Sequence, residues 1–170
     1  KPILNIKLKQ KDIVTNISYC DGNNVFISTS AGYSLIFDIS EVGITGIKTS
    51  GVKSIKLKND YVTNGIIFDD SYEYITVSTD KGSLKRVKIS ELDKSSRANR
   101  GVLILHEVKT NPHKLLKTLI LNTKDELGIK LNDEIKVLKN SEIPIMDRYS
   151  TGSSFSKEIN DIFEIKKLEN

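Results

Sequence analysis

Few side chains in this sequence have the types and spacing that catalysis or metal binding needs. His106 and His113 lie seven residues apart, whereas two histidines that share a metal on one helix are about four apart. The acidic stretches 69–70 and 132–134 are short polar turns. We find no phosphate-cradling loop, no pair of catalytic carboxylates and no activated nucleophile. The sequence therefore predicts a domain that carries out no reaction by itself and holds no metal or cofactor.

Cysteine and tyrosine chemistry is equally limited. Cys20, in an expected turn, is the single cysteine of the 170 residues, so no internal disulfide can form and a reducing compartment is expected. None of the six tyrosines has a setting suited to covalent catalysis. No apolar run is long enough to cross a membrane. These features favour a cytoplasmic domain whose partner is not a membrane.

The chemistry that the sequence does offer is the binding of anions by lysine and arginine. The whole chain has a formal net charge of +4, yet residues 81–100 alone hold seven basic residues and two acidic ones. Arg97 and Arg148 each lie four residues before a glycine, and Arg100 stands directly before Gly101. Basic groups that recur at one position of a repeated unit would form a line able to follow a phosphate backbone.

Ten basic residues are the candidate nucleic-acid contacts, and we expect those of residues 81–100 to contribute most. The ten are Lys48, Lys53, Lys56, Lys81, Lys85, Arg86, Lys88, Arg97, Arg100 and Arg148. No aromatic side chains that could stack single-stranded bases are interleaved with them, so duplex DNA, held by its backbone and bent, is the expected ligand. The alternative is that these lysines and arginines are ordinary charged residues on the solvent-exposed face of a sheet and bind no ligand.

These residues are positioned by a unit of about fifty residues that occurs three times. A fixed period in this range is typical of repeat architectures. The residues that recur with a shift of 50 are Gly32, Ser40, Glu41 and Gly51, which return as Gly82, Ser90, Glu91 and Gly101. The last three of these return once more, 51 residues further on, as Ser141, Glu142 and Gly152.

Each unit contains a predicted β-hairpin. Residues 25–39, 74–89 and 127–138 each hold two short runs rich in β-branched, aromatic and aliphatic residues, separated by a turn. Glycine suits the tight turn of the second hairpin, and asparagine and aspartate tolerate the left-handed backbone in the third. The runs 52–57 and 62–68 are further expected strands. Residues 159–168 are either a last strand or a short helix.

Four strands in about fifty residues predict an all-β, propeller-like fold of about three and a half four-stranded blades. Residues 7–16 match residues 56–64, so we expect the numbering to begin inside a unit and the chain to be part of a longer polypeptide. The expected divisions of this single repeat domain are 1–22 for the end of a preceding blade, 23–72 and 73–124 for two blades, and 125–170 for the last blade and the C-terminal tail.

The second unit resembles a blade of the C-terminal domain of the A subunit of bacterial type IIA topoisomerases. The pattern that carries the resemblance is Gly82-x-x-Lys85-Arg86-x-x-x-Ser90-Glu91, then Arg97-x-x-Arg100-Gly101-Val102. Parts of it recur in residues 32–62 and 141–152. The resemblance implies a β-pinwheel, in which propeller-like blades exchange strands with their neighbours and carry DNA around a basic outer perimeter.

Within that family, the sequence is more similar to topoisomerase IV than to gyrase. Gyrase A subunits carry a glutamine- and arginine-rich box with paired glycines, and the nearest stretches here, 97–102 and 148–153, lack both the glutamine and the glycine pair. The resemblance implies a non-catalytic domain that bends duplex DNA and presents it to the strand-passage core for relaxation and decatenation.

The same resemblance implies the partners of the domain. They would be duplex DNA, the N-terminal breakage-reunion domain of the same chain, which holds the catalytic tyrosine, and the ATPase B subunit. ATP and Mg²⁺ would act elsewhere in the parent enzyme, and the domain would work in the bacterial cytoplasm, at the nucleoid.

Two alternatives stay open at the level of the sequence. One is a gyrase A C-terminal domain that wraps DNA for supercoiling. The other is a propeller that binds proteins, since a fold alone does not decide function. A protein platform presents aromatic anchors on one face, whereas a DNA-bending blade needs lysine and arginine on its outer edge. Aromatic residues make up 6% of the chain, which disfavours the platform.

Overall fold

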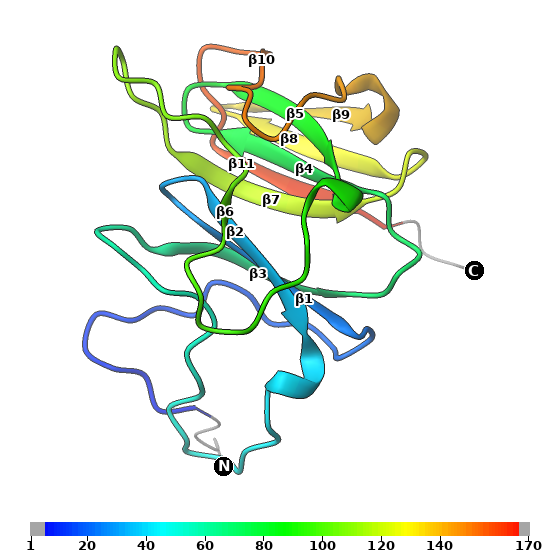
Figure 1. The fold of residues 1–170 in the computed structure, drawn as a ribbon. Helices are drawn as coiled ribbons and strands as arrows, with labels where there is room; N and C mark the ends of the chain where they lie inside the picture. The colour runs from blue at the N-terminus through cyan, green and yellow to red at the C-terminus, as the bar shows by residue number, and fades with distance from the viewer. Residues whose placement is uncertain (1–5, 167–170) are drawn as a thin grey trace.

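The computed structural model describes residues 6–166, which form eleven strands in three antiparallel sheets. Figure 1 shows the sheets following one another along the chain, from the blue and cyan strands of the first to the yellow and red strands of the last. The innermost strands β3, β7 and β11 of successive sheets contact one another. The prediction of an all-β, pinwheel-like fold is confirmed, and the three sheets of residues 6–166 do not close into a ring.

The first sheet has the strand order β3-β1-β2-β6. Its centre is the predicted hairpin of β1 (Asn24–Thr29) and β2 (Tyr33–Asp38), joined on the inner side by β3 (Val62–Phe68). The outermost strand, β6 (Val102–Leu103), follows Gly101 and comes from the second repeat unit. The first sheet is therefore completed by the next unit.

The second sheet repeats this arrangement with the order β10-β5-β4-β7. The hairpin of β4 (Tyr74–Thr79) and β5 (Ser83–Lys88) is again the predicted one, with β7 (Leu115–Leu121) on its inner side. The outermost strand, β10 (Ser153–Ser154), follows Gly152 of the third unit. Strand exchange between neighbouring units thus occurs twice.

The third sheet contains three strands within residues 6–166, in the order β11-β8-β9. The predicted hairpin is formed by β8 (Glu126–Leu131) and β9 (Glu134–Lys139), with the left-handed backbone at its turn on Asn132, whose φ is 36°. The stretch 159–168, predicted as a strand or a short helix, contains the strand β11 (Asp161–Ile165). Residues 167 and 168 of that stretch lie outside the described residues.

A short 3-10 helix follows each hairpin and contains the repeated Ser-Glu pair. These helices are η1 (Ile39–Glu41), η2 (Ile89–Glu91) and η3 (Asn140–Glu142). Each turns the chain away from the hairpin and into the long loop that ends at the next positive-φ glycine. The predicted strand 52–57, which follows Gly51, was wrong. Ile55 is buried, but Val52 and Leu57 are exposed and the segment pairs with another loop instead of a sheet.

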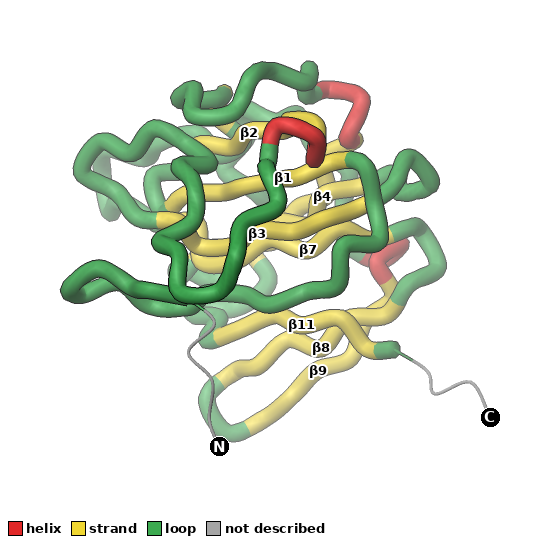
Figure 2. Tube along the Cα trace, turned by 90° about the horizontal axis from the view of Figure 1, so that it is seen from below, coloured by secondary structure: helices red, strands yellow, loops and turns green. Residues whose placement is uncertain are grey.

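The core consists of apolar side chains that fill the space between successive sheets. Phe26 of the first sheet packs with Ile75 and Val87 of the second, and Leu84 and Leu121 of the second pack with the third. Figure 2 shows the layers from a second direction, with β1, β3, β4 and β7 on one side and β11, β8 and β9 on the other. Both faces of the middle sheet are covered, which explains why its strands lack a clean apolar and polar alternation.

No helix within residues 6–166 is long and apolar enough to cross a membrane.

Candidate nucleic-acid interface

The basic residues of the first and second units meet where two loops lie side by side at the outer edge of the first sheet. The backbone N–H of Ala98 donates to the carbonyl of Ser54 at 2.8 Å, and that of Lys56 donates to Asn99 at 2.8 Å. The second loop runs directly into β6, the outermost strand of the first sheet. The paired loops therefore lie on the rim of the row of sheets.

Five cationic side chains gather on these paired loops, and we call them the rim cluster: Lys53, Lys56, Lys58, Arg97 and Arg100. The three lysines are exposed, and both arginines are partly exposed. The sequence analysis missed Lys58, although the alternation in Lys56-Leu57-Lys58 is a signal that could have found it. The carboxylates that contact members of the cluster belong to Glu41 and Asp60. The rim cluster thus keeps a local excess of positive charge.

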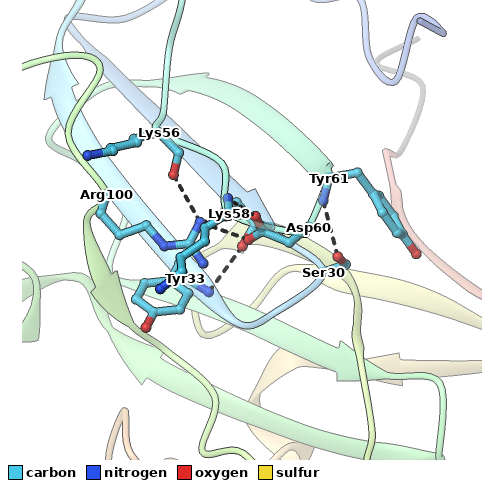
Figure 3. Close-up of polar contacts among 8 residues, drawn as sticks. Ser30, Tyr33, Lys56, Lys58, Asp60, Tyr61 and Arg100 are labelled. Carbon is cyan, nitrogen blue, oxygen red and sulfur yellow. Dashed lines mark hydrogen bonds and ion pairs between the residues drawn. The ribbon is translucent and has the colours of Figure 1, made fainter. Parts of the chain in front are cut away.

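Arg100 is held in a fixed position within the rim cluster, as Figure 3 shows. Its Nη1 donates to the carbonyl of Lys56 at 2.9 Å and lies 3.0 Å from both carboxylate oxygens of Asp60. The guanidinium group also stacks 3.8 Å above the ring centroid of Tyr33, a cation–π contact. Since 24% of its side chain remains exposed, Arg100 joins the two units and still reaches solvent.

Asp60 is the buried anion that fixes this end of the loop. Its side chain is 1% exposed, and one carboxylate oxygen accepts a hydrogen bond from the backbone N–H of Lys58 at 2.7 Å. Burial opposes ionisation, but hydrogen bonds from Arg100, Lys58 and Thr29 outweigh it and lower the pKa of Asp60 below its usual value of 3.8. The carboxylate is therefore charged at neutral pH, and its stabilising contribution is lost when the pH falls through the lowered pKa.

The arginine that recurs in the repeat holds its loop against the preceding unit. Arg97 Nη1 donates to the carbonyl of Lys53 at 2.5 Å, and Arg148 Nη1 donates to the carbonyl of Leu103, fifty residues further on, at 3.0 Å. The backbone N–H of Arg97 donates to Glu41 at 2.8 Å, and that of Arg148 donates to Glu91 at 3.3 Å. The recurrence of arginine and of Ser-Glu with the same period thus has a structural cause, because each arginine loop is fixed to the preceding unit.

The N-terminal segment repeats one contact of this loop pair. The backbone N–H of Lys7 donates to the carbonyl of Thr49 at 2.9 Å, as that of Lys56 does to Asn99 in the next unit. Lys7 and Lys56 occupy matching positions of the sequence repeat.

Lys85 does not lie on the surface, contrary to its expected role in binding DNA. Its residue is 1% exposed, and its Nζ donates to the carbonyls of Asp147, Arg148 and Ser150 at 3.1, 2.9 and 2.9 Å. The lysine occupies a strand position whose outer side is covered by the loop of the third unit. We therefore remove Lys85 from the candidate contacts and assign it to fixing that loop.

Arg86 is also buried, at 6% exposure, so its expected contact with DNA is corrected in the same way. Its Nε donates to the carbonyl of Ile143 at 2.7 Å, Nη2 donates to Ser141 at 3.3 Å, and the guanidinium group stacks 4.7 Å from the ring centroid of Tyr74. Charge counted along the sequence does not reveal which lysines and arginines are used inside the fold.

The buried position of Lys85 predicts an unusual dependence of stability on pH. Burial lowers the pKa of Lys85 to about 8 from 10.5, with partial compensation from Asp147 and Glu91. The folded chain therefore binds this proton more weakly than the unfolded chain. The Lys85 contribution to the free energy of unfolding should rise between these two pH values by up to about 1.4 kcal/mol per pH unit.

Urea unfolding of the wild type and Lys85→Met at several pH values from neutral to alkaline measures this effect. The variant should lack the alkaline rise that the lysine causes. An identical pH dependence in both proteins would contradict a lowered pKa for Lys85.

The other candidate residues stand apart from the rim cluster. Lys48 lies in the loop after η1, Lys81 in the β4–β5 turn and Lys88 at the end of β5, and all three are exposed. Arg148 is partly exposed and stacks on the neighbouring Tyr149, 4.1 Å from its ring centroid. The structure thus brings four of the ten predicted residues together: Lys53, Lys56, Arg97 and Arg100.

Metal ligands do not gather within the part of the chain that the structure describes. No group of three or more His, Cys, Asp or Glu residues of 6–166 could hold a metal ion. The two histidines contact each other, because the ring Nε2 of His113 lies 2.8 Å from the backbone carbonyl oxygen of His106.

Comparison with known proteins identifies relatives of this repeat. The family of the DNA gyrase C-terminal domain, β-propeller, matches residues 23–68 and 73–122. The A subunit of DNA topoisomerase 4 from Bacillus subtilis is 35% identical over 161 residues, covering 93% of this chain and 20% of the relative. The corresponding protein of Streptococcus pyogenes serotype M1 is 41% identical over 111 residues, covering 65% of this chain and 13% of the relative. The chain therefore spans about a fifth or less of the length of these relatives.

Solved structures show the same architecture. A crystal structure of the C-terminal domain of DNA topoisomerase IV superposes with a TM-score of 0.90 at 35% identity, covering 95% of this chain and 53% of the other. A structure of the DNA gyrase A C-terminal domain gives a TM-score of 0.84 at 18% identity, covering 96% and 58%, and is a likeness of fold. On the match to its family and on this architecture, the chain belongs to the family of DNA gyrase C-terminal β-propeller domains, with topoisomerase IV proteins among its relatives.

Proposed function

We propose that this domain binds duplex DNA along its rim and bends it, as the non-catalytic DNA-binding part of the A subunit of a topoisomerase IV. The observation that carries the proposal is the rim cluster, in which five cations from two units share one edge with two carboxylates. The names of the relatives, which are topoisomerase subunits, support DNA as the anion.

The expected mode is contact with the phosphate backbone. The rim-cluster lysines lie on loops, and no helix longer than the three-residue 3-10 turns occurs within residues 6–166, so the described residues offer no helix that could enter the major groove. Cations placed along an edge neutralise phosphates without reading bases, and they favour a duplex that curves around that edge. Binding should therefore depend on salt and little on sequence.

The wider context is part of the same proposal. The domain presents its DNA segment to the strand-passage core for relaxation and decatenation. The partners are the breakage-reunion domain of the same polypeptide and the ATPase-bearing B subunit of the holoenzyme. ATP and Mg²⁺ act in those parts, and the domain needs no cofactor of its own. The setting is the bacterial cytoplasm, at the nucleoid.

The test is DNA binding by this chain across a salt series. Fluorescence anisotropy with a short labelled duplex, from about 50 to about 200 mM salt, should give a slope of log K against log[salt] of about −3 to −5, as expected for four or five phosphate contacts. Two duplexes of unrelated sequence should bind alike, and supercoiled plasmid should compete better than linear plasmid. Absence of binding at about 50 mM salt would contradict the proposal and favour a protein-binding platform.

A further inference from the structure

The backbone hydrogen bond that Lys56 makes to the loop of the next unit occurs at three matching places of the repeat. The three bonds run from Lys7 to Thr49 at 2.9 Å, from Lys56 to Asn99 at 2.8 Å and from His106 to Ser150 at 3.3 Å. Ile55 and Leu105, which precede the second and third donors, are both 3% exposed. In the third loop pair, formed by residues 103–114 and 146–152, His106 therefore takes the place that Lys56 has in the rim cluster.

This place in the repeat is open to solvent. Lys56 is exposed although two further units follow it in the chain, so a following unit does not cover the position. His106 is likewise exposed, and together with Lys109 it lines a surface hollow of about 490 Å³. Arg148, which matches Arg97, is partly exposed on the paired loop. A positive charge on His106 could therefore contact a ligand that lies along the rim, as the lysines of the rim cluster can.

His113 makes the contact that Arg100 makes in the rim cluster. There, Arg100 donates to the carbonyl of Lys56, and the Lys56 side chain points away from Asp60 (Figure 3). In the third loop pair, the carbonyl of His106 lies 2.8 Å from the ring Nε2 of His113. A carbonyl oxygen only accepts hydrogen bonds, so Nε2 of His113 carries a proton and donates it. The backbone of His106 is thus fixed as that of Lys56 is, and its side chain is left at the surface.

The charges around His106 nearly cancel, in contrast to those of the rim cluster. The charged side chains on the third loop pair and in contact with it are Lys85, Lys109, Lys114 and Arg148, and the carboxylates of Glu91, Glu107 and Asp147. Lys85 is buried beneath the loop, so three cations face solvent with three carboxylates. The rim cluster has five cations and two carboxylates. The charge state of His106 therefore decides whether the third loop pair attracts an anion.

We propose that His106, in its protonated form, is a further phosphate contact that extends the DNA-binding rim from the rim cluster to the third loop pair. Histidine is the side chain that gains a proton between about pH 8 and about pH 5. A neutral imidazole offers at most a hydrogen bond, whereas an imidazolium also neutralises a phosphate and releases its counterion. The inference rests on the proposed function, and it adds that one contact of the rim depends on pH.

Anisotropy titrations with the short labelled duplex at about pH 7.5 and about pH 5.8, each across the salt series, test the proposal. At about 100 mM salt, the affinity of the wild type should rise about 2- to 5-fold at the lower pH. The slope of log K against log[salt] should become more negative by up to about 0.9, the value of one phosphate contact. Circular dichroism at both pH values checks that the chain is equally folded.

Three variants assign the pH effect to one side chain. His106→Gln cannot gain a proton, and at both pH values it should bind DNA as the wild type does at the higher pH. His106→Lys carries a permanent charge, and at both pH values it should bind as the wild type does at the lower pH. His113→Gln is the matched control, because it keeps a side-chain N–H for the carbonyl of His106 and should retain the pH dependence of the wild type.

The outcomes separate this inference from the proposed function. A wild type with the same affinity and salt slope at both pH values, or a pH dependence that persists in His106→Gln, would overturn the role of His106 and leave DNA binding by the rim cluster intact. Absence of duplex binding at both pH values and about 50 mM salt would overturn the proposed function and this inference together. A gain in affinity at the lower pH that only His106→Gln abolishes supports the proposal.

Discussion

Replacing Gly101 with alanine should lower the free energy of unfolding by about 3 kcal/mol or more. Gly101 has a φ of 77°, which L-residues rarely adopt, and an added Cβ would lie 2.0 Å from the carbonyl oxygen of Ser34. Ser34 pairs with Val102, so relief of the clash must push β6 away from β2 and open the edge of the first sheet. Urea unfolding followed by circular dichroism measures the loss.

Gly51→Ala is the matched control for this prediction. Gly51 has a similar φ of 71°, but no described atom lies within 4 Å of its added Cβ. The free energy of unfolding of the control should therefore fall by only about 1 kcal/mol, which is the cost of placing alanine in the left-handed region. Both variants are compared at the same protein concentration. Equal losses at the two glycines would show that the contact between units contributes little.

Replacing Lys53, Lys56 and Lys58 together with glutamine should weaken duplex DNA binding by about 10- to 100-fold at about 100 mM salt. Each lost phosphate contact should also reduce the slope of log K against log[salt] by about 0.9, giving about 2.7 for the three. The lysines are preferred to the arginines because Arg97 and Arg100 hold the loops together, and their loss would mix stability with binding. Anisotropy titrations across the salt series provide both numbers.

A charge-matched control separates the rim cluster from the net charge of the chain. Lys124, Lys130 and Lys157 are exposed and belong to the β7–β8 turn and the third unit. Their triple replacement by glutamine changes the total charge by the same amount, and the salt slope should stay within about 0.5 of the wild type. If both triple variants lose affinity equally, the rim cluster is not the site and the binding is a diffuse effect of charge.

The three hairpins were predictable because their signals are local. Alternating β-branched residues and a short turn report on pairs of strands that are adjacent in the chain, and the residue bounds of β1, β2, β4, β5, β8 and β9 agree closely with that pattern. The segment 52–57 has similar composition but is a loop, because its partner is residues 98–99 of the next unit and not a neighbouring strand. Local propensity does not contain that partner.

The candidate site shows the same contrast between what local sequence signals predict and what contacts between units decide. The sequence identified lysine and arginine as the useful chemistry, and it placed the repeated arginine and Ser-Glu pair at fixed intervals. Lys85 and Arg86 looked like surface cations until the loop of the third unit was seen to cover them, with carbonyl oxygens replacing the water that each charge needs.

The sequence by itself determined the period, the all-β class, the hairpins and the family resemblance, because these depend on residue types and on spacing along the chain. The tertiary structure alone decided which cations reach the rim and which hold neighbouring units together. Those outcomes depend on contacts between residues about fifty positions apart, such as Arg97 with Glu41 and Arg100 with Asp60. A lysine or arginine side chain is exposed and free to bind a ligand where no loop of the next unit covers it, and it forms hydrogen bonds inside the fold where such a loop does.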